Sequence, residues 1–224
     1  MININNAVQF QHLIWDRVMT NAKVVVDATC GNGHDLLYLA ERAQKGCHLY
    51  GIDIQMQAIN TSKELLRSNG IAQDVSLTFI HRSHDKALSE DIKDNDIDLM
   101  IFNLGYLPGS NHQIITEPHH TINAIQEGLG KLDNSGVITV VAYPGTEEGL
   151  AEKEYLQSYL KNLNQKLYNV CHWQPMNQVN QPPLNYLFYR SDRVFVIINN
   201  FNAYMTNKRP VLGSFIYTLV YSNS

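Results

Sequence analysis

The fold of this chain is decided by Val24-Val25-Val26-Asp27-Ala28-Thr29-Cys30-Gly31-Asn32-Gly33-His34-Asp35. Three β-branched residues lead into an acid and a small-residue turn, and apolar residues then recur at helical spacing. A buried strand that ends in a Gly-x-Gly turn and opens a helix points free backbone N–H groups at one place. The stretch therefore predicts a strand–turn–helix unit that binds an anionic or carboxylate-bearing ligand.

Two ligand classes use such a turn, dinucleotides and S-adenosylmethionine (SAM). A dinucleotide fingerprint requires a third small residue three places after the second glycine, so that helix and strand pack closely. Leu36 occupies that place, which weakens the dinucleotide interpretation. Asp27, followed by Gly31 and Gly33, instead resembles the first motif of SAM-dependent methyltransferases. Thr29 stands where that superfamily often has its first glycine.

Length and charge set limits on the protein class. A chain of 224 residues suffices for one α/β domain with a sizeable core. The formal net charge of −4 gives no overall attraction to nucleic acid, so an RNA partner must meet a local basic patch. The three cysteines form no Cys-x-x-Cys pair and are expected to be reduced thiols. With no signal-peptide pattern and no apolar run of roughly 18 residues, we expect a cytoplasmic protein without a membrane segment.

Strand-like and helix-like segments alternate along the chain. We expect strands over residues 24–28, 47–54, 76–81, 98–103, 137–143, 168–173 and 184–189, and helices over residues 8–19, 34–44, 57–68, 121–132 and 147–163. This alternation predicts an α/β fold, with a mostly parallel seven-stranded sheet and helices on both faces. We expect one domain over residues 1–190 and a C-terminal extension over 191–224, for which no structure is predicted.

Polar residues follow the second and third expected strands, where the ligand of an open α/β sheet binds. Asp53 lies twenty residues after Gly33, and its carboxylate can accept two hydrogen bonds from a ribose diol. Ser83 and His84 follow the third strand, where an adenine edge would lie. For these two residues, turn formation without any ligand contact is an equally good interpretation.

The loop after the fourth expected strand is Phe102-Asn103-Leu104-Gly105-Tyr106-Leu107-Pro108-Gly109. An amine methyltransferase must point a neutral nitrogen at the sulfonium methyl group and relieve it of a proton. The side-chain oxygen of Asn103 can accept an N–H bond from that nitrogen, and the Tyr106 ring can pack on the target base. A strained turn with Tyr106 in the core is the alternative.

Other polar residues have simpler interpretations. We expect His12 on the surface of the first helix, Cys171 in the core, and no metal site, because His119-His120 has no companion ligand at a useful spacing. Four glutamates near the start of the helix at 147–163 suit its dipole and are expected to be solvated: Glu147, Glu148, Glu152 and Glu154.

Taken together, these segments resemble a bacterial family of SAM-dependent methyltransferases long labelled rRNA methylases. Its studied members are tRNA methyltransferases that complete 5-methylaminomethyl-2-thiouridine at the wobble position. The resemblance is carried by residues 27–35, 53–55, 83–86 and 102–109, with Thr121-Ile122, Ala124-Ile125, Gly145, Glu148-Gly149, Glu152-Lys153, Asn177-Gln178, Asn180 and Pro182-Pro183.

The resemblance implies a Rossmann-like class I methyltransferase that transfers a methyl group from SAM to the exocyclic amine of 5-aminomethyl-(2-thio)uridine in the anticodon region of tRNA. It assigns catalysis to Asn103 and Tyr106. It implies cofactor contacts from Asp27, Thr29, Gly31, Asn32, Gly33, Asp35, Asp53, Gln55, Ser83, His84, Asn103 and Leu104. It implies substrate contacts from Tyr106, Pro108, Gly109, Tyr143, Asn177 and Asn180.

The chain also departs from the family pattern. Pro144 and Thr146 flank Gly145 where the family usually has histidines. An rRNA or small-molecule N-methyltransferase, or a SAM-binding module without catalysis, therefore stays open as an alternative function. The sequence also leaves open whether two copies form a homodimer. The basic residues expected to meet tRNA are Arg190, Arg193, Lys208 and Arg209.

Overall fold

The computed structural model describes residues 6–71, 75–105, 118–178 and 181–191. Contacts divide the chain into one unit of residues 3–195 and another of residues 1–2 and 196–224. The described residues belong to the first unit, and the expected domain boundary at residue 190 stays a prediction. None of the helices in these described ranges has the length and apolar character that crossing a membrane requires.

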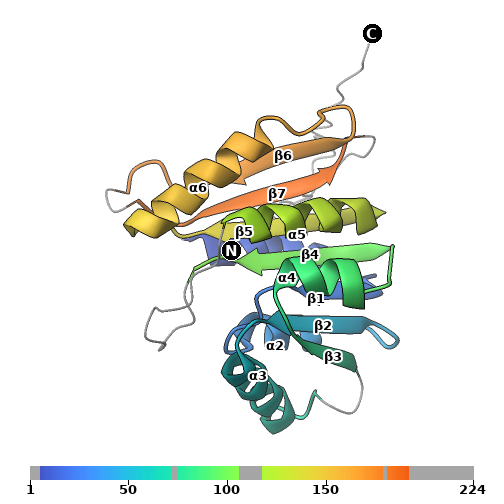
Figure 1. Cartoon of the computed structure of the whole chain (residues 1–224). Coiled ribbons are helices and arrows are strands. Elements are labelled where there is room, and N and C mark those ends of the chain that lie inside the picture. The colour runs from blue at the N-terminus through green and yellow to red at the C-terminus, as the bar shows by residue number, and fades with distance from the viewer. Residues whose placement is uncertain (1–5, 72–74, 106–117, 179–180, 192–224) are drawn as a thin grey trace, which may run out of the picture. The chain divides into compact units, whose positions relative to one another are not determined.

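Seven strands form one sheet in the order β3-β2-β1-β4-β5-β7-β6 (Figure 1). β1 to β5 are mutually parallel, and β7 runs antiparallel to both β5 and β6. The predicted seven-stranded, mostly parallel sheet is therefore confirmed. The strands are Val24–Asp27 (β1), His48–Asp53 (β2), Ser76–His81 (β3), Ile97–Asn103 (β4), Leu132–Ala142 (β5), Tyr168–Trp173 (β6) and Leu184–Arg190 (β7).

Helices cover both faces of the sheet, as predicted. Alternate strand residues point to opposite faces, so Val25 and Leu99 join one apolar core, while Val26 and Met100 join the other. The first core includes residues of α1 (Ala7–Val18), α2 (His34–Ala40) and α3 (Met56–Ser68). The second includes residues of the π-helix η2 (Ala87–Asp91), α5 (Pro118–Lys131) and α6 (Glu147–Leu160); the short α4 (His84–Lys86) precedes η2.

Trp15 anchors α1 on the sheet. Its side chain is fully buried, and its indole N–H donates to Thr139 Oγ1 of β5 at 3.0 Å. Full burial of a large apolar side chain contributes about 2–3 kcal/mol, and the hydrogen bond satisfies the polar end of the ring. The face of α1 that carries Trp15 is therefore held against β5.

Some element boundaries differ from the prediction. The α-helix α2 ends at Ala40 rather than near residue 44, because the hydrogen bonds that follow span three residues instead of four, as in a 3₁₀-helix. The Arg42 N–H donates to Leu39 O, and the Ala43 N–H donates to Ala40 O. β5 begins at Leu132 rather than residue 137, with a register irregularity opposite residues 97–99. The helical turns α4 and η2 were not predicted.

Two expected environments are corrected by the structure. Glu152 is not solvated: it is 5% exposed and lies against α5, where Thr121 Oγ1 donates to Glu152 Oε1 at 3.4 Å. Burial raises the pKa of Glu152 to about 7. Cys171 is not in the core: it is exposed on β6, which lies at the edge of the sheet and is partly open to solvent.

Candidate functional site

The turn between β1 and α2 is held in place by α3 and by the end of β2. Gly33 has a φ of 85°, and a Cβ on it would lie 2.8 Å from Ser62 Cα, so only glycine fits. The Ser62 hydroxyl donates to the carbonyl of Gly31 at 2.9 Å. Asp53 Oδ2 accepts the Gly31 N–H at 2.9 Å, and Asp53 Oδ1 accepts the Gln55 N–H at 2.8 Å. Asp53 therefore shapes the turn, in addition to any ligand contact.

Three carboxylates gather around this turn, from Asp27, Asp35 and Asp53. Asp27 is buried, and its Oδ1 accepts the Thr29 N–H at 3.1 Å. Its Oδ2 has no hydrogen-bond partner in the described part of the chain. Burial, followed by the nearby Asp35, raises the pKa of Asp27 well above its ordinary value. Such a site favours a ligand with positive charge and N–H donors.

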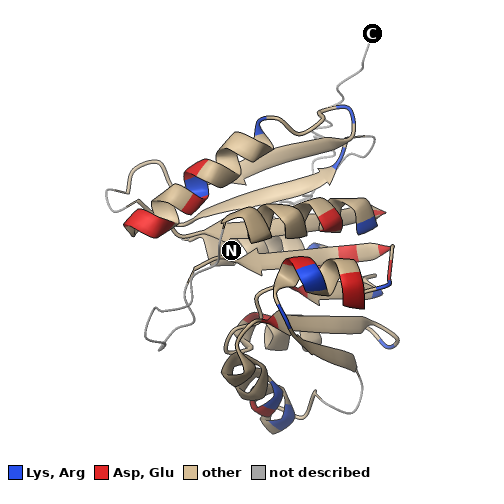
Figure 2. Cartoon of the chain, in the orientation of Figure 1, with Lys and Arg blue, Asp and Glu red and all other residues tan. Residues whose placement is uncertain are grey.

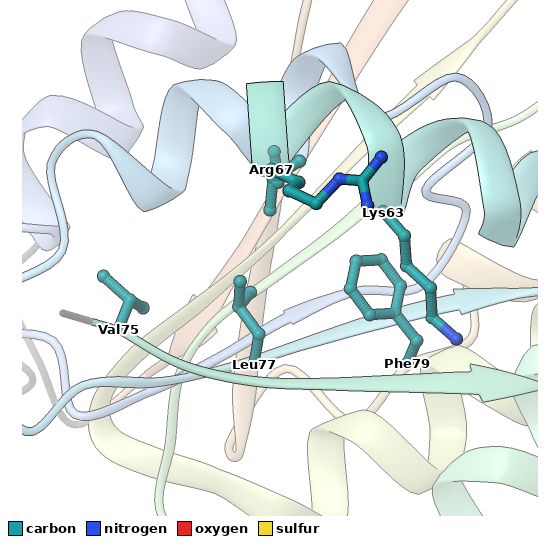
Figure 3. A pocket seen from close by; sticks show the side chains of 6 residues that line it. Lys63, Arg67, Val75, Leu77 and Phe79 are labelled. Atoms are coloured by element: carbon teal, nitrogen blue, oxygen red, sulfur yellow. The ribbon is translucent and has the colours of Figure 1, made fainter. Parts of the chain in front are cut away.

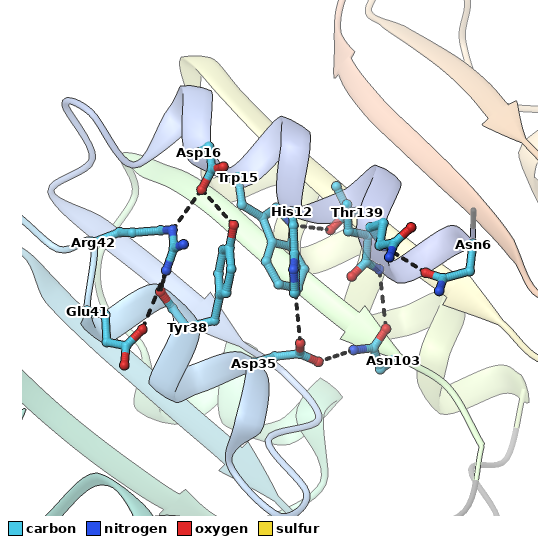
Figure 4. Close-up of polar contacts among 12 residues, drawn as sticks. Asn6, His12, Trp15, Asp16, Asp35, Tyr38, Glu41, Arg42, Asn103 and Thr139 are labelled. Carbon is cyan, nitrogen blue, oxygen red and sulfur yellow. Dashed lines mark hydrogen bonds and ion pairs between the residues drawn. The ribbon is translucent and has the colours of Figure 1, made fainter. Parts of the chain in front are cut away.

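Asn103 ends β4 directly beside these carboxylates. Its backbone N–H donates to Thr29 Oγ1 at 2.7 Å, and its side-chain Nδ2 donates to Asp35 Oδ2 (Figure 4). Its Oδ1 accepts a hydrogen bond from Gln11 Nε2 at 3.2 Å. A carboxylate is an acceptor only, so Asp35 determines that the amide NH₂ faces it and that the oxygen faces away.

The helix α1 brings a histidine to the same carboxylate. His12 Nε2 lies 3.5 Å from Asp35 Oδ1, and the His12 ring stacks on Tyr38 with ring centroids 3.8 Å apart. The guanidinium of Arg42 lies over the Tyr38 ring, 3.4 Å from its centroid. Asp16 accepts hydrogen bonds from Tyr38 Oη and Arg42 Nε, each at 2.7 Å (Figure 4). His12 was expected to be an ordinary surface residue; the structure instead places it against the carboxylate of the site.

Tyr143, at the end of β5, also belongs to this neighbourhood. A Cβ on Gly105 would lie 3.7 Å from Tyr143 Cδ2, so the ring lies beside the residues that follow Asn103. Burial, followed by the negative charge of Asp35, raises the pKa of Tyr143 to about 12. Tyr143 as a residue is nevertheless 39% exposed, so it is not fully enclosed by protein.

The His84 side chain is largely buried. It is 8% exposed and packs edge-on against Phe102, in the apolar core below α5. Burial lowers its pKa to about 4. The ring is therefore largely enclosed by protein, and the assignment of His84 to the cofactor site stays a prediction. Ser83 stays half-buried at the N-cap of α4.

The other residues predicted to contact the cofactor or substrate either make few side-chain contacts or lie outside the described ranges. Leu104 is buried, and its N–H donates to Val141 O at 2.9 Å. Asn32 is half-buried in the turn, and Asn177 is exposed after β6. β6 is parallel to β5, because β7 is antiparallel to both, so Asn177 follows a strand that ends at the edge where Asn103 lies. Outside the described residues lie Tyr106, Pro108, Gly109 and Asn180, together with Arg193, Lys208 and Arg209 of the expected basic patch.

A hollow of about 430 Å³ lies between α3 and β3 (Figure 3). Lys63 Nζ lies 5.4 Å from the centroid of the Phe79 ring, and no predicted site residue lines this hollow. Its lining residues are Lys63, Leu66, Arg67, Val75, Leu77 and Phe79. Within the described ranges, no group of three His, Cys, Asp or Glu side chains is placed to hold a metal ion.

Known proteins resemble the chain over most of its length. Residues 49–189 match the family described as "Putative rRNA methylase". The chloroplastic tRNA (mnm(5)s(2)U34)-methyltransferase of Arabidopsis thaliana is 31% identical over 193 residues, covering 83% of this chain and 70% of that protein.

Solved structures agree with this match. A Clostridium thermocellum structure with the same description as the family is 34% identical, has a TM-score of 0.76, and is matched over 84% of this chain and 99% of its own. A Streptococcus mutans methyltransferase in complex with S-adenosylhomocysteine (SAH) is 30% identical, with a TM-score of 0.73 and the same coverage of each chain. This chain therefore belongs to the rRNA methylase family and is a methyltransferase with a Rossmann-like fold.

Proposed function

We propose that the chain is a SAM-dependent tRNA methyltransferase. Its substrate is the exocyclic amine of 5-aminomethyl-(2-thio)uridine at the wobble position, and its product is 5-methylaminomethyl-(2-thio)uridine. One observation carries this proposal: Asp35 fixes the Asn103 amide at the end of β4, with its oxygen directed away from the carboxylate. An amide held in this way can orient an amine. The relative from Arabidopsis thaliana, named for a reaction on tRNA, supports the choice of substrate.

The residues around the turn fit SAM. The orphaned Asp27 Oδ2 and the neighbouring carboxylates suit a ligand with ammonium and sulfonium charges. Backbone N–H groups at the start of α2 suit the methionine carboxylate, and Asp53 suits the ribose hydroxyl groups. Bound SAM supplies an electrophilic methyl group, so that the amine nitrogen gains an N–C bond as the C–S bond electrons pass to sulfur.

The chain itself orients the nucleophile and stabilises its charge. Asn103 Oδ1 has two lone pairs, of which one accepts from Gln11 Nε2, so the second can accept an N–H bond of the amine. The nitrogen gains positive charge during the transfer, and the carboxylate of Asp35 next to Asn103 favours that charge. Tyr106 is proposed to pack on the uracil ring. A nearby strong base is unnecessary if the amine enters neutral, so Thr146 can replace the usual family histidine.

The RNA contact is proposed to lie in the C-terminal segment. In Figure 2, Lys and Arg residues on α3 lie next to an acidic residue, and α6 is mainly acidic, so neither helix offers a basic surface. We propose that tRNA is met near Arg190 and by the basic residues of the extension. Removal of residues 191–224 should then weaken tRNA binding and reduce its salt dependence, while SAH affinity is preserved. Measuring the mass of the complex with tRNA will show whether one copy of the chain or a homodimer is bound.

The test is methyl transfer by the purified protein from labelled SAM to a panel of acceptors. The panel contains tRNA bearing 5-aminomethyl-2-thiouridine, the same tRNA with an unmodified wobble uridine, rRNA, and small primary amines. We expect label only in the first tRNA. Label in rRNA or in the small amines would establish the alternative substrates. SAM binding without any transfer would establish a module without catalysis.

A further inference from the structure

We infer that Gln11 is a substrate-contacting residue, whose side-chain oxygen accepts an N–H bond from the amine that is methylated and so limits the reaction to a single methyl transfer. The inference rests on the proposed function, because it names a second contact to the same amine. Gln11 lies on α1, in a part of the sequence without any recognisable motif.

Gln11 carries a buried acceptor that is left unpaired. Its side chain is 0% exposed, although glutamine is a residue that usually lies at the surface. Its Nε2 donates to Asn103 Oδ1 at 3.2 Å, while its Oε1 has no hydrogen-bond partner among the described residues. A buried unpaired acceptor costs about 1–3 kcal/mol, so its retention calls for a partner that binds during function.

The orientation of this amide follows from the charges around it. Asp35 accepts hydrogen bonds only, so the Asn103 NH₂ group must face Asp35 and the Asn103 oxygen must face Gln11. That oxygen requires a donor, which fixes the Gln11 NH₂ group opposite it. The Gln11 oxygen is thereby left as the unpaired atom, and exchanging the two ends of the amide would place two oxygens against each other.

Two acceptors consequently lie close to each other near the end of β4, one on each amide. One is the second lone pair of Asn103 Oδ1, and the other is Gln11 Oε1, which is bonded to the same amide carbon as the nitrogen that contacts Asn103. A neutral primary amine has two N–H bonds and one lone pair. Accepting both N–H bonds leaves the nitrogen lone pair directed away from the two amides, which is the orientation that a displacement at carbon requires.

The same pair of acceptors discriminates against the product. After transfer, the nitrogen carries one methyl group and, once a proton has left to solvent, one N–H bond. A secondary amine can satisfy only one of the two acceptors while its lone pair faces the methyl donor, so the other acceptor stays buried and unpaired. A polar group left unpaired disfavours a ligand strongly. A second methylation is therefore suppressed.

Gln11→Met is the variant that tests this inference, because methionine has a similar length and no amide. Gln9→Met is the matched control, since it makes the same change on the exposed side of the same helix. Both variants and the wild type are assayed with SAM and tRNA bearing 5-aminomethyl-2-thiouridine. The measurements are kcat, SAH affinity by calorimetry, and the monomethylated and dimethylated nucleosides by mass spectrometry. The product ratio does not depend on the fraction of protein that is folded.

We expect Gln11→Met to lower kcat by about tenfold to a hundredfold, to change SAH affinity less than about twofold, and to yield dimethylated nucleoside on long incubation. Gln9→Met should match the wild type in all three measurements. Unchanged kcat with monomethylated product alone would overturn the inference while the proposed function stands. A loss of SAH affinity by tenfold would also overturn it, because the oxygen would then bind the cofactor. Absence of transfer by the wild type would overturn both.

Discussion

Replacing Gly33 by alanine tests whether the turn after β1 must approach α3 as closely as the structure shows. Gly33 has a φ of 85°, and its added Cβ would lie 2.8 Å from both Cα and Oγ of Ser62. Gly46 offers a matched control: its φ is 89°, but an added Cβ would have no heavy atom within 4 Å. The two substitutions therefore share the backbone strain and differ in the collision.

The expected magnitudes follow from this difference. An alanine with positive φ costs about 1 kcal/mol of unfolding free energy, which is the whole effect expected for Gly46→Ala. Overpacking at Gly33 adds about 1–3 kcal/mol, because backbone atoms of α3 must move. Gly33→Ala should therefore lower the unfolding free energy by about 2–4 kcal/mol. It should also weaken SAH binding by about tenfold, since displaced N–H groups at the start of α2 lose ligand contacts.

Urea unfolding measures the first effect and calorimetry with SAH measures the second. Gly46→Ala should bind SAH as the wild type does. Equal unfolding free energies for Gly33→Ala and Gly46→Ala, together with unchanged SAH affinity in both, would refute the argument that the close approach of the turn to α3 shapes the ligand site.

Three further predictions concern individual side chains. Asn103→Ala should lower kcat by roughly a hundredfold or more, in the range for loss of one oriented polar group; wild-type turnover would show that the amine is oriented elsewhere. Asp53→Ala should weaken SAH binding at least about tenfold, and unchanged calorimetric affinity would remove the ribose assignment. Glu152 has an ordinary pKa of 4.5 that burial raises to about 7, so the folded protein keeps a proton that the unfolded chain releases. Unfolding free energy should therefore fall by roughly 1–3 kcal/mol as pH rises between these values; Glu152→Gln should lack this fall, and equal slopes in wild type and variant would contradict the assignment.

The sheet could be predicted because its local signals are strong. Runs of β-branched and apolar residues were bounded by polar or turn-forming residues, and these patterns determine strand positions without knowledge of the tertiary fold. The positions of Asp27 and Asn103 at the ends of parallel strands, and of Gly33 in the turn after the first of them, followed from the same alternation. The short helical segment at residues 84–91 was missed, because one turn of α-helix and one of π-helix carry no periodic apolar pattern.

The contribution of α1 could not be predicted, since its contacts are tertiary. Gln11 and Asn103 are 92 residues apart in the sequence, and no local pattern indicates which edge of the sheet a preceding helix will cover. The burial of Glu152, by contrast, had a signal. Glu152 is followed at intervals of four by Leu156 and Leu160, which are buried on the same helix face. The expectation of a solvated face overlooked that spacing.

The central claim, methylation of the wobble 5-aminomethyl group, is tested most directly by nucleoside mass spectrometry of tRNA from a strain that lacks this protein. The account predicts that 5-aminomethyl-2-thiouridine accumulates and that 5-methylaminomethyl-2-thiouridine disappears. Expression of the wild-type chain should restore the methylated nucleoside, and expression of Asn103→Ala should not. An undiminished level of 5-methylaminomethyl-2-thiouridine in the deletion strain would contradict the claim.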